Sequence, residues 1–129
     1  MTSSFRTDRV RLAILVKRKP GTSKEEFSRY WAEVHGPLFA SLPIAKSSIM
    51  KYEQAHANTA ALQSLQAAGL KALEGDGMVI FEAESYEKII EVMRSDDYQK
   101  IVIPDAEKFM DLGESQVLPV DLVTLIDKA

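Results

Sequence analysis

The chain has 129 residues, of which 46% are hydrophobic and 27% are charged, and its net charge is −3. This length and composition fit one ordinary globular domain and argue against disorder, collagen-like repeats and the broad basic surface of a nucleic-acid-binding protein. The chain has no cysteine, which excludes disulfides, thiolate catalysis and cysteine-ligated zinc.

The first ten residues, MTSSFRTDRV, have no apolar segment of the kind found in secretory signals. No stretch approaches the roughly 18 apolar residues that a membrane span needs. We therefore expect a cytoplasmic protein with neither a membrane nor a nucleic acid as partner. We expect residues 1–8 to be disordered and residues 9–129 to form a single domain.

The first half of the chain begins with an apolar, β-branched stretch over residues 10–16, which predicts a strand that ends before Pro20 and Gly21. Ser23 with Glu26 three residues later forms a capping box, which predicts the start of a helix. Its inward face is predicted from apolar residues at spacings of three and four: Phe27, Tyr30, Trp31, Val34 and Leu38. Gly36 and Pro37 then predict that this helix ends at His35.

The stretch 48–56 alternates and predicts a second strand, with Met50, Tyr52, Gln54 and His56 on one face. Asn58 is suited to cap a short helix that ends before the turn residues 75–77. Residues 78–84 predict a third strand.

Ser85 is suited to cap a second main helix, and further helix begins near Ser95 and is interrupted by Pro104. Residues 117–126 predict the last strand. The element order is strand-helix-strand twice, which predicts an α+β, ferredoxin-like split βαβ fold with extra helices.

The predicted strands are apolar or mixed on both faces, whereas helices cover only one face of such a sheet. Large apolar patches are rarely left exposed in monomers. We therefore expect a homodimer in which two sheets face one another and enclose an apolar cavity.

His35 is the first candidate catalytic residue, because an imidazole exchanges a proton near neutral pH. At a helix C-terminus its pKa would be raised by the helix dipole. The alternative is that His35 only caps the last carbonyls of the helix.

Tyr52, Gln54 and His56 would project together from one strand face. A phenol can donate a hydrogen bond to a carbonyl or enolate oxygen, and an imidazole can move the proton, which suits decarboxylation or dehydration. The alternative is that these side chains pack against helices and only satisfy local hydrogen bonds.

Asp121 is a lone carboxylate in an apolar strand, where it could orient a histidine or protect a sheet edge. The two histidines lack the spacing of a metal site, and no nucleotide-binding motif is present, so we expect neither a metal nor another cofactor. We assign substrate binding to Trp31, Met50, Gln54 and Phe81.

Several stretches resemble the EthD family of dimeric α/β-barrel proteins, among them LVKRKPGTSKEEFSRYWAEVHGPLF, IMKYEQAH and LPVDLVTLID. The resemblance spans residues 10–127. These stretches also resemble the fungal EthD-domain proteins found among the tailoring enzymes of polyketide and other secondary metabolism. It implies a ferredoxin-like dimer, a cofactor-free small-molecule function and a histidine at position 35.

The sequence thus predicts a cofactor-free acid–base enzyme that decarboxylates, dehydrates or cyclises an aromatic or polyketide-derived small molecule. His35 and His56 would carry protons, Tyr52 would donate to the substrate oxygen, and Asp121 would orient a histidine. Two alternatives stay open: an oxidoreductase of the anthrone-oxidising type, and a non-catalytic accessory protein that binds a small molecule.

Overall fold

A computed structural model describes residues 4–128 and has four antiparallel strands, joined in the order β2-β3-β1-β4. The strands are β1 (Val10–Val16), β2 (Lys51–His56), β3 (Gly77–Ala83) and β4 (Gln116–Val120). The α-helices are α1 (Lys24–Tyr30), α2 (Gly36–Ala40), α3 (Pro43–Ser48), α4 (Thr59–Ala67), α5 (Tyr86–Arg94) and α6 (Ile103–Ala106). Two π-helical turns, η1 (Trp31–His35) and η2 (Tyr98–Val102), and one 3₁₀ turn, η3 (Leu112–Glu114), complete the chain. This strand order confirms the predicted ferredoxin-like α+β fold.

The helix starts follow the predicted capping residues. Ser23 Oγ accepts a hydrogen bond from the Glu26 backbone N–H at 3.1 Å, and Asn58 Oδ1 accepts one from the Ala61 N–H at 3.0 Å. Ser85 begins α5 in the same way. Each cap satisfies an N–H that has no carbonyl partner within its helix.

The prediction that the first helix ends at His35 is wrong. The chain stays helical through Gly36, whose backbone N–H bonds to the Trp31 carbonyl five residues earlier, and α2 continues to Ala40. Pro37 has no N–H and its ring would press on the carbonyl four residues before it. The wider π-turn accommodates the proline without breaking the helix.

The same arrangement recurs in the second half of the chain. The N–H of Ile103 bonds to the Tyr98 carbonyl in η2, directly before Pro104 in α6. Pro104 therefore does not interrupt the helical segment as predicted. Both π-turns carry buried side chains: Trp31 and His35 in η1, and Val102 in η2.

The last strand is shorter than predicted, since β4 ends at Val120. Beyond it, the Leu122 carbonyl accepts a hydrogen bond from the Arg6 N–H at 2.8 Å, and Phe5 forms an isolated bridge with Val123. Residues 4–8, which we expected to be disordered, thus run beside the C-terminal segment. The remainder of the expected disorder, residues 1–3, lies outside the described residues.

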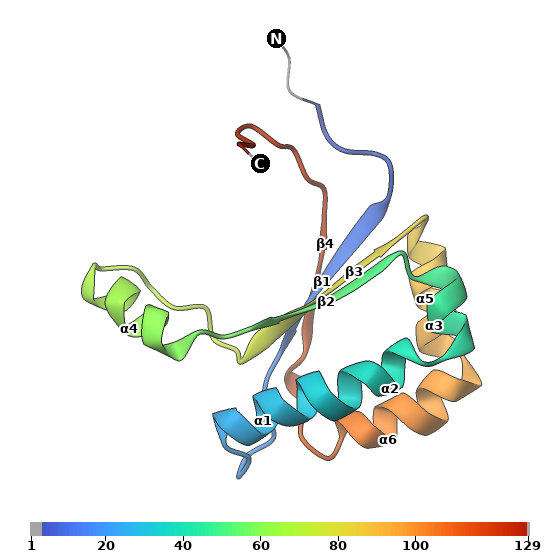
Figure 1. Cartoon of the computed structure of the whole chain (residues 1–129), viewed down its shortest axis with the longest axis horizontal. Helices are drawn as coiled ribbons and strands as arrows, with labels where there is room; N and C mark the ends of the chain where they lie inside the picture. The colour runs from blue at the N-terminus through green and yellow to red at the C-terminus, as the bar shows by residue number, and fades with distance from the viewer. Residues whose placement is uncertain (1–3, 129) are drawn as a thin grey trace.

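Helices α1, α2, α3, α5 and α6 gather on one side of the sheet, while α4 projects from one end (Figure 1). The main core lies between this side of the sheet and the helices, and Trp31, Phe27, Ile89 and Val92 are its most completely buried large side chains. We call this side the helix face, and the opposite side the open face.

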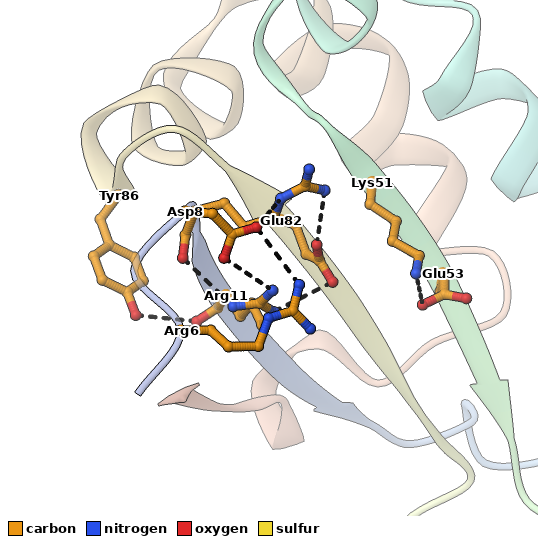
Figure 2. A network of polar contacts seen from close by, with 8 residues as sticks. Arg6, Asp8, Arg11, Lys51, Glu53, Glu82 and Tyr86 are labelled. Carbon is orange, nitrogen blue, oxygen red and sulfur yellow. Dashed lines mark hydrogen bonds and ion pairs between the residues drawn. The ribbon is translucent and has the colours of Figure 1, made fainter. Parts of the chain in front are cut away.

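The open face carries ion pairs at one end and apolar residues at the other. Arg11 and Glu82 are direct cross-strand partners and are only 2% and 8% exposed. Glu82 pairs with Arg11 Nε at 3.4 Å and with Arg9 Nη1 at 3.0 Å, and Asp8 lies against the same arginines (Figure 2). At the other end, Leu15, Leu73, Met78 and Leu118 border a shallow apolar depression.

Candidate active site

A cavity of about 300 Å³ lies between the helix face of the sheet and the helices. The sequence led us to expect a cavity between two facing sheets instead. β2 turns Tyr52 toward α2, where its ring meets Phe39 edge-on with centroids 5.0 Å apart, so this strand face points into the protomer. The lining residues come from both layers: Ile14, Val16, Trp31, His35, Phe39, Tyr52, Val79, Phe81, Tyr98, Val102, Ile103, Ala106, Met110, Leu112, Ser115 and Val117.

His35 lines this cavity and is bound to a buried carboxylate. Its Nδ1 lies 2.9 Å from Asp105 Oδ2, and both residues are 7% exposed. The second carboxylate oxygen accepts a hydrogen bond from the Tyr30 hydroxyl at 2.5 Å. Lys108 Nζ approaches the same oxygen at 3.6 Å from the solvent side. Residues from η1, α1 and α6 therefore meet at one carboxylate.

The charges of this group follow from its surroundings. Burial lowers the pKa of His35 below its usual 6.5, and the hydrogen bond and charge of Asp105 offset only part of this effect. The expectation of a raised pKa fails because His35 is buried inside a continuous helix rather than placed at its end. Burial alone would raise the pKa of Asp105, but hydrogen bonds from Tyr30 and His35, with the charges of His35 and Lys108, hold it below its usual value.

A neutral His35 beside an ionised Asp105 has one favourable arrangement of its proton. The carboxylate only accepts hydrogen bonds, so the imidazole proton resides on Nδ1. Nε2 then carries a free lone pair, and it has no hydrogen-bond partner among residues 4–128. The pair thus presents a proton acceptor to an apolar cavity.

Two phenols accompany His35 in the cavity, Tyr52 from β2 and Tyr98 from η2. Burial raises the pKa of Tyr52, and the Gln54 amide and the Trp31 indole N–H, which face its oxygen, offset part of this rise. Burial raises the pKa of Tyr98, and the charge that Tyr52 carries as a phenolate raises it further. Both phenols are therefore protonated at neutral pH and can donate hydrogen bonds.

The rest of the cavity is apolar apart from Trp31 and Ser115. The indole Nε1–H of Trp31 is buried and makes no hydrogen bond of normal geometry within the described chain. An unpaired buried donor is uncommon, because its desolvation is uncompensated. No Lys, Arg, Asp or Glu is among the described residues that line the cavity.

His56 and Gln54 lie beside the cavity but do not line it. His56 Nδ1 contacts the Ser28 hydroxyl, and its Nε2 lies 2.8 Å from Gln54 Oε1. The imidazole also lies against the Trp31 indole, with ring centroids 4.4 Å apart and ring planes tilted by 39°. The predicted convergence of Tyr52, Gln54 and His56 is thus present as a hydrogen-bonded row, with only Tyr52 facing the cavity.

The remaining predicted site residues have different positions. Trp31 and Phe81, which we predicted to bind substrate, line the cavity. Met50 precedes β2, is 48% exposed and is not among the lining residues. Asp121 is exposed just beyond β4 and is not brought to either histidine; the carboxylate beside His35 is that of Asp105.

Asp105, Tyr30 and Tyr98 were not predicted as site residues from the sequence. Asp105 resembles an ordinary acidic residue in the first turn of a helix. A signal was nevertheless present, since Val102, Ala106 and Phe109 are spaced along one buried helix face, and Asp105 lies on that face. An acid at such a position needs a partner, because an unpaired buried charge is strongly unfavourable.

Within residues 4–128, no group of three or more His, Asp or Glu side chains is placed to hold a metal ion. In the same part of the chain, no helix has the length and apolar character needed to cross a bilayer.

Comparisons with known proteins agree with this architecture. Residues 19–113 match the EthD domain family. The dehydratase UstZ of Ustilaginoidea virens is 30% identical over 113 residues, which cover 83% of this chain and 79% of that protein.

Solved structures give the same fold at lower identity. An EthD family protein from Bacillus halodurans is 18% identical with a TM-score of 0.52, over 92% of this chain and 99% of that one. A dimeric ferredoxin-like protein of unknown function from Bacteroides fragilis is 13% identical with a TM-score of 0.58, over 92% and 98%. A dimeric ferredoxin-like protein from Thermobifida fusca is 11% identical with a TM-score of 0.55, over 88% and 91%. Since the family match covers most of the sequence, the chain belongs to the EthD domain family.

Proposed function

We propose that this protein is an acid–base enzyme that needs no cofactor and removes water from an aromatic or polyketide-derived hydroxy ketone. The observation that carries the proposal is the His35–Asp105 pair, whose uncharged imidazole borders an apolar cavity together with two protonated phenols. The similarity to a protein named as a dehydratase supports dehydration over decarboxylation or cyclisation.

In the proposed reaction, Nε2 of His35 removes the proton on the carbon next to the substrate carbonyl. The resulting enolate oxygen accepts a hydrogen bond from the hydroxyl of Tyr52, which lines the cavity. The enolate then reforms its carbonyl and a C=C bond as the β-hydroxyl leaves. That hydroxyl takes the proton held by His35 and departs as water, which restores the neutral imidazole.

The electrostatics of the cavity favour an uncharged substrate. With His35 neutral, the formal charge next to the lining is the Asp105 carboxylate, which Lys108 pairs with from the solvent side. No cationic side chain among the described lining residues is available to pair with a substrate carboxylate. A carboxylic acid would therefore lose its hydration without gaining a partner, which disfavours a decarboxylase.

The proposal is tested with two neutral ketones in deuterated buffer. Benzylacetone has no leaving group, so it reports proton abstraction alone through deuterium uptake. The aldol of benzaldehyde with acetone reports dehydration through the ultraviolet absorption of benzylideneacetone. We expect His35→Gln to slow both reactions by at least about 100-fold, whereas the exposed Glu33→Gln keeps wild-type rates.

Other outcomes separate the alternatives. Oxygen consumption with an anthrone substrate would support the oxidoreductase. Ligand binding that is unchanged in His35→Gln, with no exchange by the wild type, would support a non-catalytic accessory protein.

We further propose that the enzyme is a cytoplasmic homodimer joined through the open face. Apolar side chains remain exposed there, including Leu118 at 60% and Leu73 at 66%. Two structural relatives are described as dimeric. Burying this surface against a second copy would remove it from water.

A further inference from the structure

Hydrogen bonds join four side chains in a row that ends at the cavity. Ser28 of α1 contacts Nδ1 of His56, and Nε2 of His56 lies 2.8 Å from Gln54 Oε1. Gln54 Nε2 then lies 2.9 Å from the hydroxyl oxygen of Tyr52. Of these four residues, Tyr52 alone is among the lining residues, so the other three support it from outside the cavity.

The direction of each hydrogen bond follows from the backbone. Gln54 Nε2 also lies 2.8 Å from the Trp31 carbonyl, which accepts hydrogen bonds and cannot donate one. This contact identifies the amide nitrogen and turns the amide oxygen toward His56. His56 must therefore carry its proton on Nε2, and its bare Nδ1 accepts from the Ser28 hydroxyl. The row donates in one direction, from Ser28 toward Tyr52.

Tyr52 accepts the last donor in this row, so its own hydrogen has to point elsewhere. We propose that Gln54 and His56 are positioning residues that hold the Tyr52 hydroxyl as a donor directed into the cavity. Gln54 acts by occupying the acceptor side of the phenol oxygen, and His56 acts by fixing which way the Gln54 amide faces. Their relevance to catalysis rests on the proposed function, in which Tyr52 donates to the substrate oxygen.

The Gln54 amide packs closely against the backbone at Gly36. A Cβ atom added at Gly36 would lie only 2.5 Å from Gln54 Nε2 and 3.0 Å from the Trp31 carbonyl oxygen. The absence of a side chain at Gly36, the first residue of α2, therefore lets the amide reach the Trp31 carbonyl. On the other side, the ring of His56 packs against the indole of Trp31. The Gln54 amide is therefore held by the Trp31 carbonyl on the helical side and by His56 of β2 on the other.

Two variants test this role without any substrate. Gln54→Met keeps the length of the side chain but removes the donor to Tyr52. His56→Phe keeps an aromatic ring on Trp31 but removes the donor that orients Gln54. We expect the titration of Tyr52 to move to higher pH in both, because a donor at the phenol oxygen stabilises the phenolate. NMR of ζ-carbon-labelled tyrosine gives the titration, with Tyr52→Phe for assignment.

Glu53→Gln is the matched control, since Glu53 is the next residue of β2 and is exposed on the open face. It should leave the Tyr52 titration unchanged. An unshifted titration in folded His56→Phe and Gln54→Met would overturn the proposal. If either variant fails to fold, the wild-type His56 tautomer decides: a proton on Nε2 supports the row, and a proton on Nδ1 contradicts it.

Activity provides a separate readout. With benzylacetone, we expect both variants to lower kcat for deuterium exchange by about tenfold with KM nearly unchanged, because a misdirected donor affects the enolate more than the bound ketone. A shifted Tyr52 titration in a protein that never catalyses exchange would refute the proposed function and leave the positioning role intact. A lower kcat with an unshifted titration would refute the positioning role.

Discussion

At the scale of single residues, the site depends on one buried carboxylate with three neighbours. Asp105 contacts Tyr30, His35 and Lys108, and each contact stabilises its ionised form. A carboxylate so placed fixes both the orientation and the proton position of the imidazole. The same contacts link the site to the stability of the fold, so both properties respond to pH.

Asp105→Asn should impair catalysis with little change in shape. The amide has no charge to stabilise an imidazolium, so the pKa of His35 should fall further and the acid limb of the exchange rate should move to lower pH. We also expect kcat to fall by about 100-fold or more, because the tautomer is no longer fixed. Deuterium exchange of benzylacetone across the pH range measures both effects. Asp96→Asn, at an exposed position, is the control, and a wild-type profile for Asp105→Asn would contradict this role.

Tyr30→Phe tests the same carboxylate through stability. The hydrogen bond to Asp105, with burial and the Asp105 charge, raises the pKa of Tyr30 from 10.0 to about 12. A raised pKa stabilises the folded state below pH 10.0, and this contribution is lost as the pH rises toward about 12. Wild type should therefore exceed Tyr30→Phe by about 2 kcal/mol in unfolding free energy near neutral pH. Urea titrations should show this difference shrinking above pH 10.0, and a constant difference would count against it.

At the scale of elements, two π-turns bring the site together. Trp31 and His35 lie in η1, Tyr98 and Val102 lie in η2, and all four line the cavity. A regular α-helix would rotate these side chains away from their present directions, since a π-turn adds one residue to the turn. Each turn directly precedes a segment with a proline near its start, Pro37 or Pro104.

Gly77→Ala tests how closely η1 packs on the sheet. An added Cβ would lie 2.5 Å from the Ala55 carbonyl oxygen and 2.6 Å from the Trp31 ring. Neither neighbour can move freely, so we expect a loss of about 2–3 kcal/mol in unfolding free energy. Gly113→Ala, where the nearest atom lies 3.7 Å away, should change it by less than about 0.5 kcal/mol. Equal stabilities in chemical denaturation would show that the contact is not tight.

The elements themselves were largely predictable, and the reasons are local. Ser23, Asn58 and Ser85 cap helices where the sequence indicated, and β1 has the predicted bounds. Gly36 and Pro37 misled the prediction, because a proline normally ends a helix or kinks it. In this protein the π-turn η1 absorbs the proline, and no local pattern in the sequence indicates such a turn.

At the scale of the whole molecule, the element order was sufficient to predict the fold but not the cavity. Both faces of the sheet are partly apolar, so alternation within β2 could not tell which face meets the helices. Asp105 and His35 are 70 residues apart and meet only through the tertiary fold. Tyr52 could be singled out because it shares a strand face with Gln54 and His56, whereas Asp105 resembles many surface acids.

Leu118→Glu tests the proposed assembly. Leu118 lies on the open face and is 60% exposed in the single chain, so a glutamate costs little there unless a second copy covers it. We expect a dimer for the wild type and a monomer for the variant in sedimentation equilibrium. Ile90→Glu on α5, at a position 44% exposed, should remain a dimer. A monomeric wild type would refute the dimer without affecting the cavity within each chain.

The central claim is that Asp105 holds His35 as a neutral base whose free nitrogen faces the cavity. Correlation of the ring protons with the ring nitrogens of nitrogen-labelled His35 at about pH 7 measures this directly. We expect one protonated nitrogen, Nδ1, and an unprotonated Nε2 whose signal shifts when benzylacetone binds. An imidazolium, or a proton on Nε2, would contradict it.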